Sequence, residues 1–231
     1  MTAPVLWADL RRFTPARVGL GRVGNALPTA AHLAFQAAHA AARDAVHAEL
    51  DIAALQADLP RPALVVHSAA ADRRTYLVRP DLGRRLAGVP KIPPQPCSLA
   101  IVICDGLSAV AVQRHAASVV AALNEAGPIV IAIQGRVAIG DDIAACLQAD
   151  AVLVLIGERP GLSTPDSLGA YLTWKPRIGH TDAERNCVSN IRPEGLSPAA
   201  AAHKLRWLIA QMRARQLTGI ALKDDATQIL S

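Results

Sequence analysis

A charged pair, Glu158 and Arg159, directly follows a short apolar run at residues 151–156. The run is continuous and β-branched, which is typical of a strand buried on both faces of a parallel sheet. Ligands of open parallel sheets bind just past the carboxyl ends of the strands. A carboxylate accepts hydrogen bonds and a guanidinium donates them, so this loop carries both kinds of polar group. The spacing therefore predicts a binding loop.

Two other apolar runs end in similar polar loops. Residues 99–104 precede Asp105-Gly106, and residues 129–134 precede the segment Gly135-Arg136-Val137. The carboxyl ends of parallel strands meet at one edge of a sheet, so we expect the three loops to share one rim. The residue types alone predict a ligand site there without identifying the ligand.

Helices are expected between these strands. Ser108 is positioned to cap a helix that runs to about residue 125, and a second helix is expected at about 141–148. Ser163 or Thr164, before Pro165, is expected to cap another. A fourth strand is expected at 170–174, and a final amphipathic helix at about 197–216 completes the pattern. The fold class is α/β, a doubly wound and mostly parallel Rossmann-like sheet preceded by a helical N-terminal portion.

The N-terminal portion reads as an arm followed by a long helix. Residues 6–28 are polar and interrupted by glycine and proline, and residues 29–50 form an alanine-rich helix with Thr29 as the expected cap. Three histidines recur on one face of this helix, His32, His39 and His47. Neighbours lie roughly 10 Å apart along the axis, too far to share one metal ion. We expect a polar stripe against another protein.

The chain is expected to divide at a proline-rich segment. Residues 89–98 hold four of the prolines, which neither continue a helix nor sit in a central strand. The division places residues 1–88 in an arm and helical portion that makes subunit contacts. Residues 99–231 then form the α/β domain that faces the ligand, although 63–68 is expected to be a further short strand.

The segment from Gly19 to Gly24 matches the dinucleotide fingerprint Gly-x-Gly-x-x-Gly. That motif needs a buried strand before it and a helix that opens on its last glycine. Here Arg11, Arg12 and Pro15 precede it and Pro28 intervenes before the helix. A glycine-jointed arm that lies on a partner is the favoured interpretation, and a nucleotide-dependent α/β enzyme remains the alternative.

Composition excludes several classes. The formal net charge is +5, yet aromatic residues make up only 3% of the chain, so the stacking surface of a single-strand binder is missing and no nucleic acid is expected. No apolar run is long enough to span a membrane, and no signal pattern begins the chain, which favours the cytoplasm. The four cysteines show no Cys-x-x-Cys spacing, so neither a metal site nor a disulfide framework is expected.

Taken together, the loops resemble a known family. CDGLSA, QGRVAIGDD, LIGERPGLSTPDSLGAYLTW and DAERNCVSNIRPEGLS are similar to the small subunit of adenosylcobalamin-dependent ethanolamine ammonia-lyase, as are LRRFTPARVGLGRVG and TYLVRPDLGRRL. The resemblance extends from about Leu10 to Lys223. GERPGL followed by RNCVSNI is a specific combination.

The resemblance implies a function. The family converts ethanolamine to acetaldehyde and ammonia through cobalt–carbon bond homolysis and a substrate radical. The large subunit does this chemistry, and the small subunit encloses the cofactor within a hetero-oligomer, so the isolated chain should be inactive. By similarity, Val137, Glu158 and Cys187 contact the cofactor, and Arg136 is a further candidate. No catalytic residue and no metal ligand is assigned to this chain.

The resemblance also implies base-on binding. Cobalamin proteins that replace the cofactor's own base with a histidine share an Asp-x-His-x-x-Gly motif, and none of the seven histidines here has that surrounding.

The chain begins without the long extension that serves as an address in microcompartment-packaged members. That start leaves microcompartment packaging without support and favours free cytoplasm.

Several alternatives stay open for these residues. Glu158 and Arg159 pair with each other or cap a helix in one interpretation, Val137 simply packs in a loop, and Cys187 is a small buried hydrophobe in a polar loop. A non-catalytic α/β interaction subunit is the second alternative for the whole chain.

Overall fold

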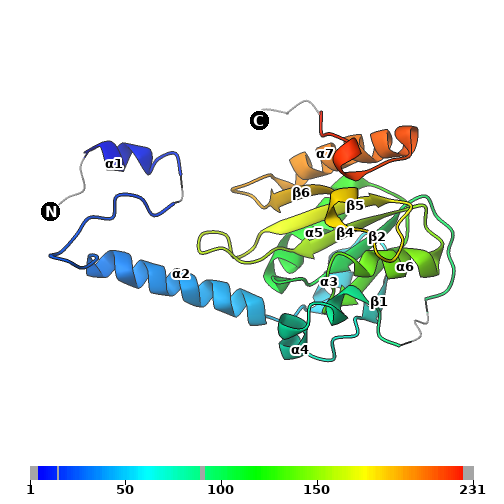
Figure 1. Cartoon of the computed structure of the whole chain (residues 1–231), viewed down its shortest axis with the longest axis horizontal. Coiled ribbons are helices and arrows are strands. Elements are labelled where there is room, and N and C mark those ends of the chain that lie inside the picture. The colour runs from blue at the N-terminus through cyan, green and yellow to red at the C-terminus, as the bar shows by residue number, and fades with distance from the viewer. Residues whose placement is uncertain (1–4, 15, 89–91, 226–231) are drawn as a thin grey trace.

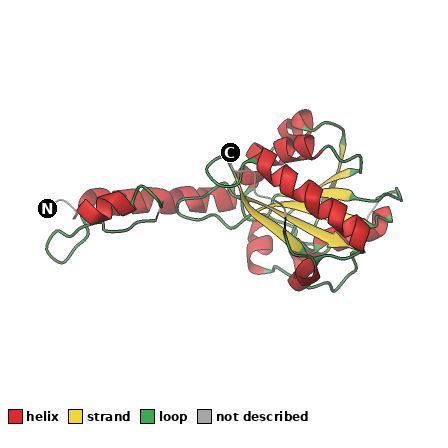
Figure 2. Cartoon of the chain, turned by 90° about the horizontal axis from the view of Figure 1, so that it is seen from above, coloured by secondary structure: helices red, strands yellow, loops and turns green. Residues whose placement is uncertain are grey.

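The computed structural model describes residues 5–14, 16–88 and 92–225. They form an α/β body from which the N-terminal residues project as an arm, residues 5–47 (Figures 1 and 2). The arm contains α1 (Val5–Leu10) and α2 (Thr29–His47). The body contains helices α3 (Ile52–Asp58), α4 (Arg73–Val78), α5 (Ala109–Leu123), α6 (Ile139–Leu147) and α7 (Pro198–Arg215), and short 3₁₀ turns η1 (Leu82–Arg84), η2 (Asp182–Glu184) and η3 (Gly219–Ala221).

A six-stranded sheet lies at the centre of the body, in the order β1-β3-β2-β4-β5-β6. Its strands are β1 (Ala63–His67), β2 (Ala100–Cys104), β3 (Ile129–Ile133), β4 (Ala151–Gly157), β5 (Leu168–Trp174) and β6 (Asn186–Ile191). The first four strands pair with one another in parallel. β5 pairs antiparallel with both of its neighbours, β4 and β6. The predicted α/β class with a mostly parallel sheet and a helical N-terminal portion is confirmed.

Helices cover both faces of the sheet, and each covered face has its own core. The first core lies between the sheet and α3, α5 and α7, with Ile103, Leu153 and Leu172 fully buried. The second lies beneath α6, with Val102, Val154 and Ile143. Every residue of β2 and β4 is buried. Burial on both faces explains why these two strands read as continuous apolar runs rather than as alternating ones.

Local signals set the ends of the helices. The Ser108 side chain accepts a hydrogen bond from the Ala111 backbone N–H at 3.2 Å, which starts α5 as predicted. Ser197 does the same for α7 at 3.3 Å. In the arm, α2 begins directly after Pro28, and Thr29 is its first helical residue rather than its cap.

Two further local predictions are wrong, besides the cap expected at Thr29. No helix follows Pro165, because residues 158–167 only turn the chain from β4 into its antiparallel neighbour β5. Cys187, expected in a polar loop, lies instead in β6. That strand is at the sheet edge and buries only Val188 and Ile191, so its sequence lacks the apolar run by which central strands are recognised.

Strands from both sides of the proline-rich segment share the sheet. β1 precedes residues 89–98 and pairs along its whole length with β3, which follows them. The first three of these linker residues lie outside the described part. The assignment of residues 1–88 to subunit contacts and of 99–231 to the cofactor stays a prediction about function.

The arm makes few contacts with the body. Only Ala45 of α2 is buried, near the body end of a helix that is about 28 Å long. The segment between α1 and α2 folds back on α1, because the Arg11 side chain donates to the carbonyls of Val18 and Gly19. The arm exposes large apolar side chains, namely Trp7, Leu10, Phe13, Val23, Leu27, Leu33 and Phe35.

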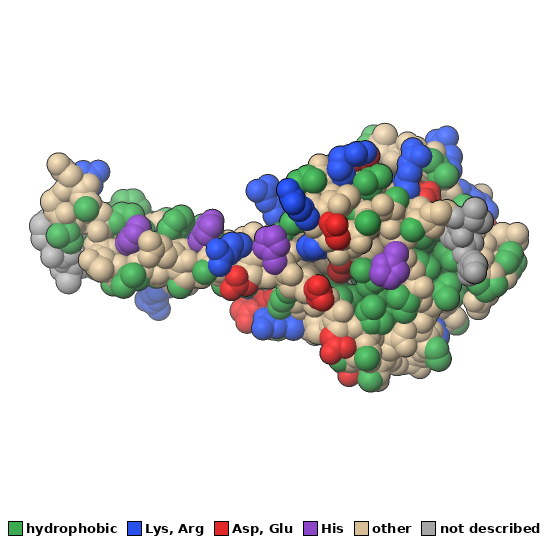
Figure 3. All heavy atoms as spheres, turned by 90° about the horizontal axis from the view of Figure 1, so that it is seen from below, with side chains coloured by type: hydrophobic (Ala, Val, Ile, Leu, Met, Phe, Trp, Pro, Cys, Tyr) green, Lys and Arg blue, Asp and Glu red, His purple; other side chains and the backbone are tan. Residues whose placement is uncertain are grey.

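The three histidines of α2 are all exposed, and Figure 3 shows histidine and hydrophobic side chains side by side along the arm. No strand precedes the glycines at 19–24 among residues 5–14 and 16–18, which are helix, turn or irregular chain. The structural context of a dinucleotide-binding motif is therefore missing.

Candidate functional site

The candidate site occupies the α6 face of the sheet where β5 and β6 extend beyond α6. Val154, Tyr171 and Cys187 are partners in three adjacent strands, so their side chains project from the same face. Val154 is buried under α6, Tyr171 packs at the edge of that core, and Cys187 is exposed. The row of three thus runs from the core to the open part of this face.

Glu158 reaches across β5 from the end of β4. Its carboxylate Oε2 accepts hydrogen bonds from the Ser167 hydroxyl and, at 3.3 Å, from the Asn190 backbone N–H of β6. The carboxylate lies over Gly169, where an added Cβ would come within 2.9 Å of Glu158 Oε1. A glycine at this point is what allows the carboxylate to lie flat against the sheet.

The predicted alternative for Glu158 is not observed. No ion pair joins Glu158 to Arg159 in the described part of the chain, and no helix begins there for it to cap. Arg159 itself is exposed. The carboxylate therefore belongs to the face that carries Cys187 and Tyr171.

Cys187 and Tyr171 interact directly. Cys187 is exposed as a residue, but neighbouring side chains shelter its thiol, and this burial raises the pKa of the thiol. A hydrogen bond with the Tyr171 hydroxyl opposes the shift, and the carboxylates of Glu158 and Asp182 add to it. Burial likewise raises the pKa of Tyr171. Both groups are neutral at pH 7, so they offer polar but uncharged contacts.

Arg136 and Val137 line a hollow of about 530 Å³ on the same face. Residues 84–85, 136–138, Asp141 with Asp142, and 178–182 form its walls. Val137 and Tyr171 both pack on the core beneath α6, Cys187 is the register partner of Tyr171, and Glu158 lies over Gly169 two positions before Tyr171. Val137, Glu158 and Cys187 therefore lie on the same face of the sheet.

Arg136 is held in place by contacts with α4 and η1. Its guanidinium stacks on the Tyr76 ring at 4.4 Å and donates to the Tyr76 carbonyl at 3.3 Å. Its backbone N–H donates to the Gly83 carbonyl at 2.7 Å. The loop after β3 is therefore fixed by α4 and η1, which belong to the N-terminal half of the chain.

The crevice between the carboxyl ends of β2 and β3 is filled by the chain's own side chains. Asp105, which is buried, accepts hydrogen bonds from the backbone N–H groups of Gly106 at 2.9 Å and Gly135 at 3.1 Å. Arg73 lies 3.6 Å from its carboxylate and also donates to the Gly106 carbonyl. The Tyr76 hydroxyl donates to the Gly135 carbonyl at 3.1 Å.

We call Arg73, Tyr76 and Asp105 the Asp105 cluster. A doubly wound sheet usually binds its ligand in this crevice, where helices leave adjacent strands toward opposite faces. Here α4 closes the crevice, and the open surface lies one strand further along, beyond β4. Sequence reasoning did not find Arg73, Tyr76 or Tyr171 because each acts through contacts between distant segments.

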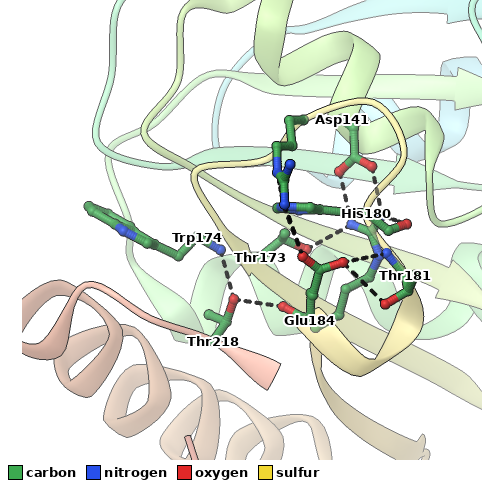
Figure 4. A network of polar contacts seen from close by, with 9 residues as sticks. Asp141, Thr173, Trp174, His180, Thr181, Glu184 and Thr218 are labelled. Carbon is green, nitrogen blue, oxygen red and sulfur yellow. Dashed lines mark hydrogen bonds and ion pairs between the residues drawn. The ribbon is translucent and has the colours of Figure 1, made fainter. Parts of the chain in front are cut away.

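A second polar network closes the far wall of the hollow. The Arg185 guanidinium binds both carboxylate oxygens of Asp141, at 2.9 and 2.6 Å, and donates to the Thr173 hydroxyl at 2.9 Å. The exposed rim of the wall is held by Glu184, which accepts from the Thr181 backbone N–H at 2.8 Å and pairs with His180 (Figure 4). Segment 178–182 is therefore a fixed wall.

The described residues contain no group of three histidine, cysteine, aspartate or glutamate side chains arranged to hold a metal ion. None of the helices in residues 5–14, 16–88 and 92–225 is long and apolar enough to cross a membrane.

Comparison with known proteins identifies the family. Residues 5–223 match the model of the Ethanolamine ammonia-lyase light chain (EutC) family. The chain is 54% identical to the ethanolamine ammonia-lyase small subunit of Xanthomonas campestris pv. campestris (strain B100), over 97% of this chain and 89% of that protein. It is 54% identical to the small subunit of Azotobacter vinelandii (95% and 88% covered) and 51% identical to that of Pseudomonas syringae pv. tomato (95% and 83%). The chain therefore belongs to the ethanolamine ammonia-lyase light-chain family.

Proposed function

We propose that this chain encloses adenosylcobalamin against the large subunit of an ethanolamine ammonia-lyase, as a non-catalytic subunit of a hetero-oligomer. The observation that carries the proposal is that Val137, Glu158 and Cys187 lie on the same face of the sheet, on which Val137 also lines a hollow. The sequence separates these residues by up to 50 positions, yet they lie on one face.

The residues present suit cobalamin. The corrin ring carries a fringe of amide side chains, whose NH₂ groups need acceptors and whose carbonyls need donors. Glu158 provides a charge-assisted acceptor on an open sheet face, since Gly169 places no side chain in front of it. Asp105 is buried and its carboxylate is bonded to backbone N–H groups and paired with Arg73, so it is not available to a ligand.

Each surface residue then has a physical role. Glu158 accepts from an amide of the cofactor, and Val137 presents an apolar contact and its backbone to the corrin edge. The neutral thiol of Cys187 allows close approach without a buried charge. Arg136 lines the hollow with its guanidinium stacked on Tyr76, and it is the candidate donor to a cofactor carbonyl there. When bound, adenosylcobalamin supplies the radical chemistry, and base-on binding is expected because no histidine here lies in a cobalt-ligating motif.

The isolated chain should have no ammonia-lyase activity. The surface carries no nucleophile or base poised at neutral pH, since the pKa values of Cys187 and Tyr171 are both raised. Mixing the purified chain with a matching large subunit, adenosylcobalamin and ethanolamine should restore turnover that neither subunit shows alone. Turnover by the chain alone would contradict the non-catalytic role.

The same mixture separates the alternatives. A nucleotide-dependent enzyme would bind NAD or a flavin as an isolated chain, which the position of Gly19–Gly24 in the arm disfavours. A non-catalytic interaction subunit without cofactor contacts would assemble with the large subunit and leave its cobalamin affinity unchanged.

Replacing Glu158 with alanine should weaken cobalamin binding by the assembled complex. A hydrogen bond to a charged group contributes roughly 1.5–3 kcal/mol, so the apparent affinity should fall about 10- to 150-fold. Glu158→Gln keeps an acceptor and should fall between wild type and alanine. The KM for ethanolamine should change little, because the substrate lies on the other subunit in this proposal.

A control in the same loop separates binding from stability. Asp166 accepts a hydrogen bond at 2.8 Å from Arg114 of α5, a helix that packs on the face of the sheet opposite α6. Asp166→Ala should therefore lower the melting temperature without changing cobalamin affinity. Equal affinity in a titration of the wild-type and Glu158→Ala complexes would remove Glu158 from the site.

A further inference from the structure

Asp141 and Arg185 form the most deeply buried ion pair among the described residues. The exposed fractions of their side chains are 2% and 1%. The guanidinium binds both oxygens of the carboxylate, donates to the Thr173 hydroxyl and reaches the His180 carbonyl at 3.3 Å. In Figure 4 Asp141, Thr173 and His180 surround this contact from three segments of the chain.

The pair connects the segments that carry two of the site residues. Asp141 lies in the first turn of α6, four positions after Val137. Arg185 immediately precedes β6 and stands two positions before Cys187. No hydrogen bond between the backbones of α6 and β6 is present in the described chain, so the side-chain pair is the direct polar link between these walls.

Stability alone does not account for such a pair. Removing two charges from water costs several kcal/mol per ion, and an apolar pair of similar volume is often as stable or more so. Arg185 also leaves its Nε buried without a hydrogen-bond partner. A bidentate pair does, however, fix both distance and angle, because the planar guanidinium matches the carboxylate.

We propose that Asp141 and Arg185 are positioning residues that hold Val137 and Cys187 at the separation the cofactor requires. The inference rests on the proposed function of the surface. Neither residue contacts the cofactor in this proposal, since both side chains are enclosed. They act by fixing α6 relative to β6 across the hollow.

The test compares two ways of removing the pair in the complex with the large subunit. Asp141→Asn keeps the shape and removes one charge, whereas the double variant Asp141→Leu with Arg185→Met removes both charges and leaves an apolar contact. The double variant should melt close to wild type or above it. Both variants should bind adenosylcobalamin about 10- to 100-fold more weakly, the range seen when partners that orient metal ligands are removed.

Two readouts distinguish positioning from folding. Titration of the complex with adenosylcobalamin gives the affinity, and the rate of Cys187 alkylation, followed by mass spectrometry, reports how well the cofactor protects the thiol. Ile209→Val, in the core on the opposite face of the sheet, is the control for a modest stability loss. It should keep wild-type affinity and wild-type protection.

The outcomes are separable. If the double variant folds and binds adenosylcobalamin as wild type does, with Cys187 equally protected, the positioning role is overturned. If the wild-type complex itself binds no cobalamin through this surface, so that Glu158→Ala has no effect either, the proposed function fails instead.

Discussion

Removing residues 1–24 is expected to weaken assembly with the large subunit by about three orders of magnitude while the body stays folded. The deleted segment exposes Trp7 and Phe13, of which Phe13 is 84% exposed. Truncating a buried aromatic anchor at an interface typically costs about 2 kcal/mol or more, and two such losses together correspond to about a thousandfold. The body should melt unchanged because none of the side chains described within residues 7–24 is buried. Analytical ultracentrifugation or titration calorimetry of the mixed subunits measures the effect.

A point variant makes this test sharper. Phe13→Ala should weaken assembly about 30-fold or more. Ile220 is the matched control, because it is 83% exposed and lies in η3 of the body. Ile220→Ala should leave assembly unchanged. Assembly that survives both the deletion and Phe13→Ala would exclude the arm from the subunit interface.

The sequence predicts the central strands well, because a strand that is buried on both faces has a continuous run of apolar residues. Residues 99–104 and 129–134 were expected as strands, and β2 and β3 begin and end within one residue of these ranges. The capping serines at 108 and 197 are local signals, and both are confirmed by hydrogen bonds to the backbone. Elements that are determined by residues close together in the sequence can therefore be predicted from it.

The rest depended on contacts that no local pattern contains. β6 has one exposed edge and a mixed sequence, so Cys187 was expected in a loop. The rim beyond β2 and β3 was expected to bind a ligand, but α4 fills it with Arg73 and Tyr76 from more than 25 residues upstream. The strand-end pattern alone points to the loops of Glu158 and Val137, whereas Cys187 comes from the family resemblance only, and only the fold puts the three on one face.

Replacing Asp105 with alanine should destabilise the body more than any change on the proposed cofactor surface. Its carboxylate accepts two backbone N–H groups and faces Arg73, which is itself largely buried. Alanine leaves these donors and the guanidinium without their acceptor. Breaking a buried charge pair from one side costs about 3–5 kcal/mol, and the urea midpoint should fall accordingly.

Asp105→Asn should be much milder, and its effect should depend on pH in a defined direction. Burial is the main cause that raises the pKa of Asp105 above its ordinary 3.8, against the backbone N–H groups and Arg73. The folded protein then holds this proton more tightly than the unfolded chain does. The free energy of unfolding therefore falls as the pH rises from 3.8 through the raised value, and asparagine does not titrate.

The free energy of unfolding of the asparagine variant, relative to that of wild type, should consequently be higher at pH 7 than near pH 4, which is about the ordinary pKa of aspartate. Urea unfolding of both proteins at the two pH values measures this difference, and titrations common to both proteins cancel. Asp105→Ala must be unstable at both values, because its loss comes mainly from unpaired donors. If the asparagine variant instead lost ground as the pH rose, ionised Asp105 would be a net stabilising partner of Arg73, and the crevice would be held by charge rather than by hydrogen bonds to its backbone.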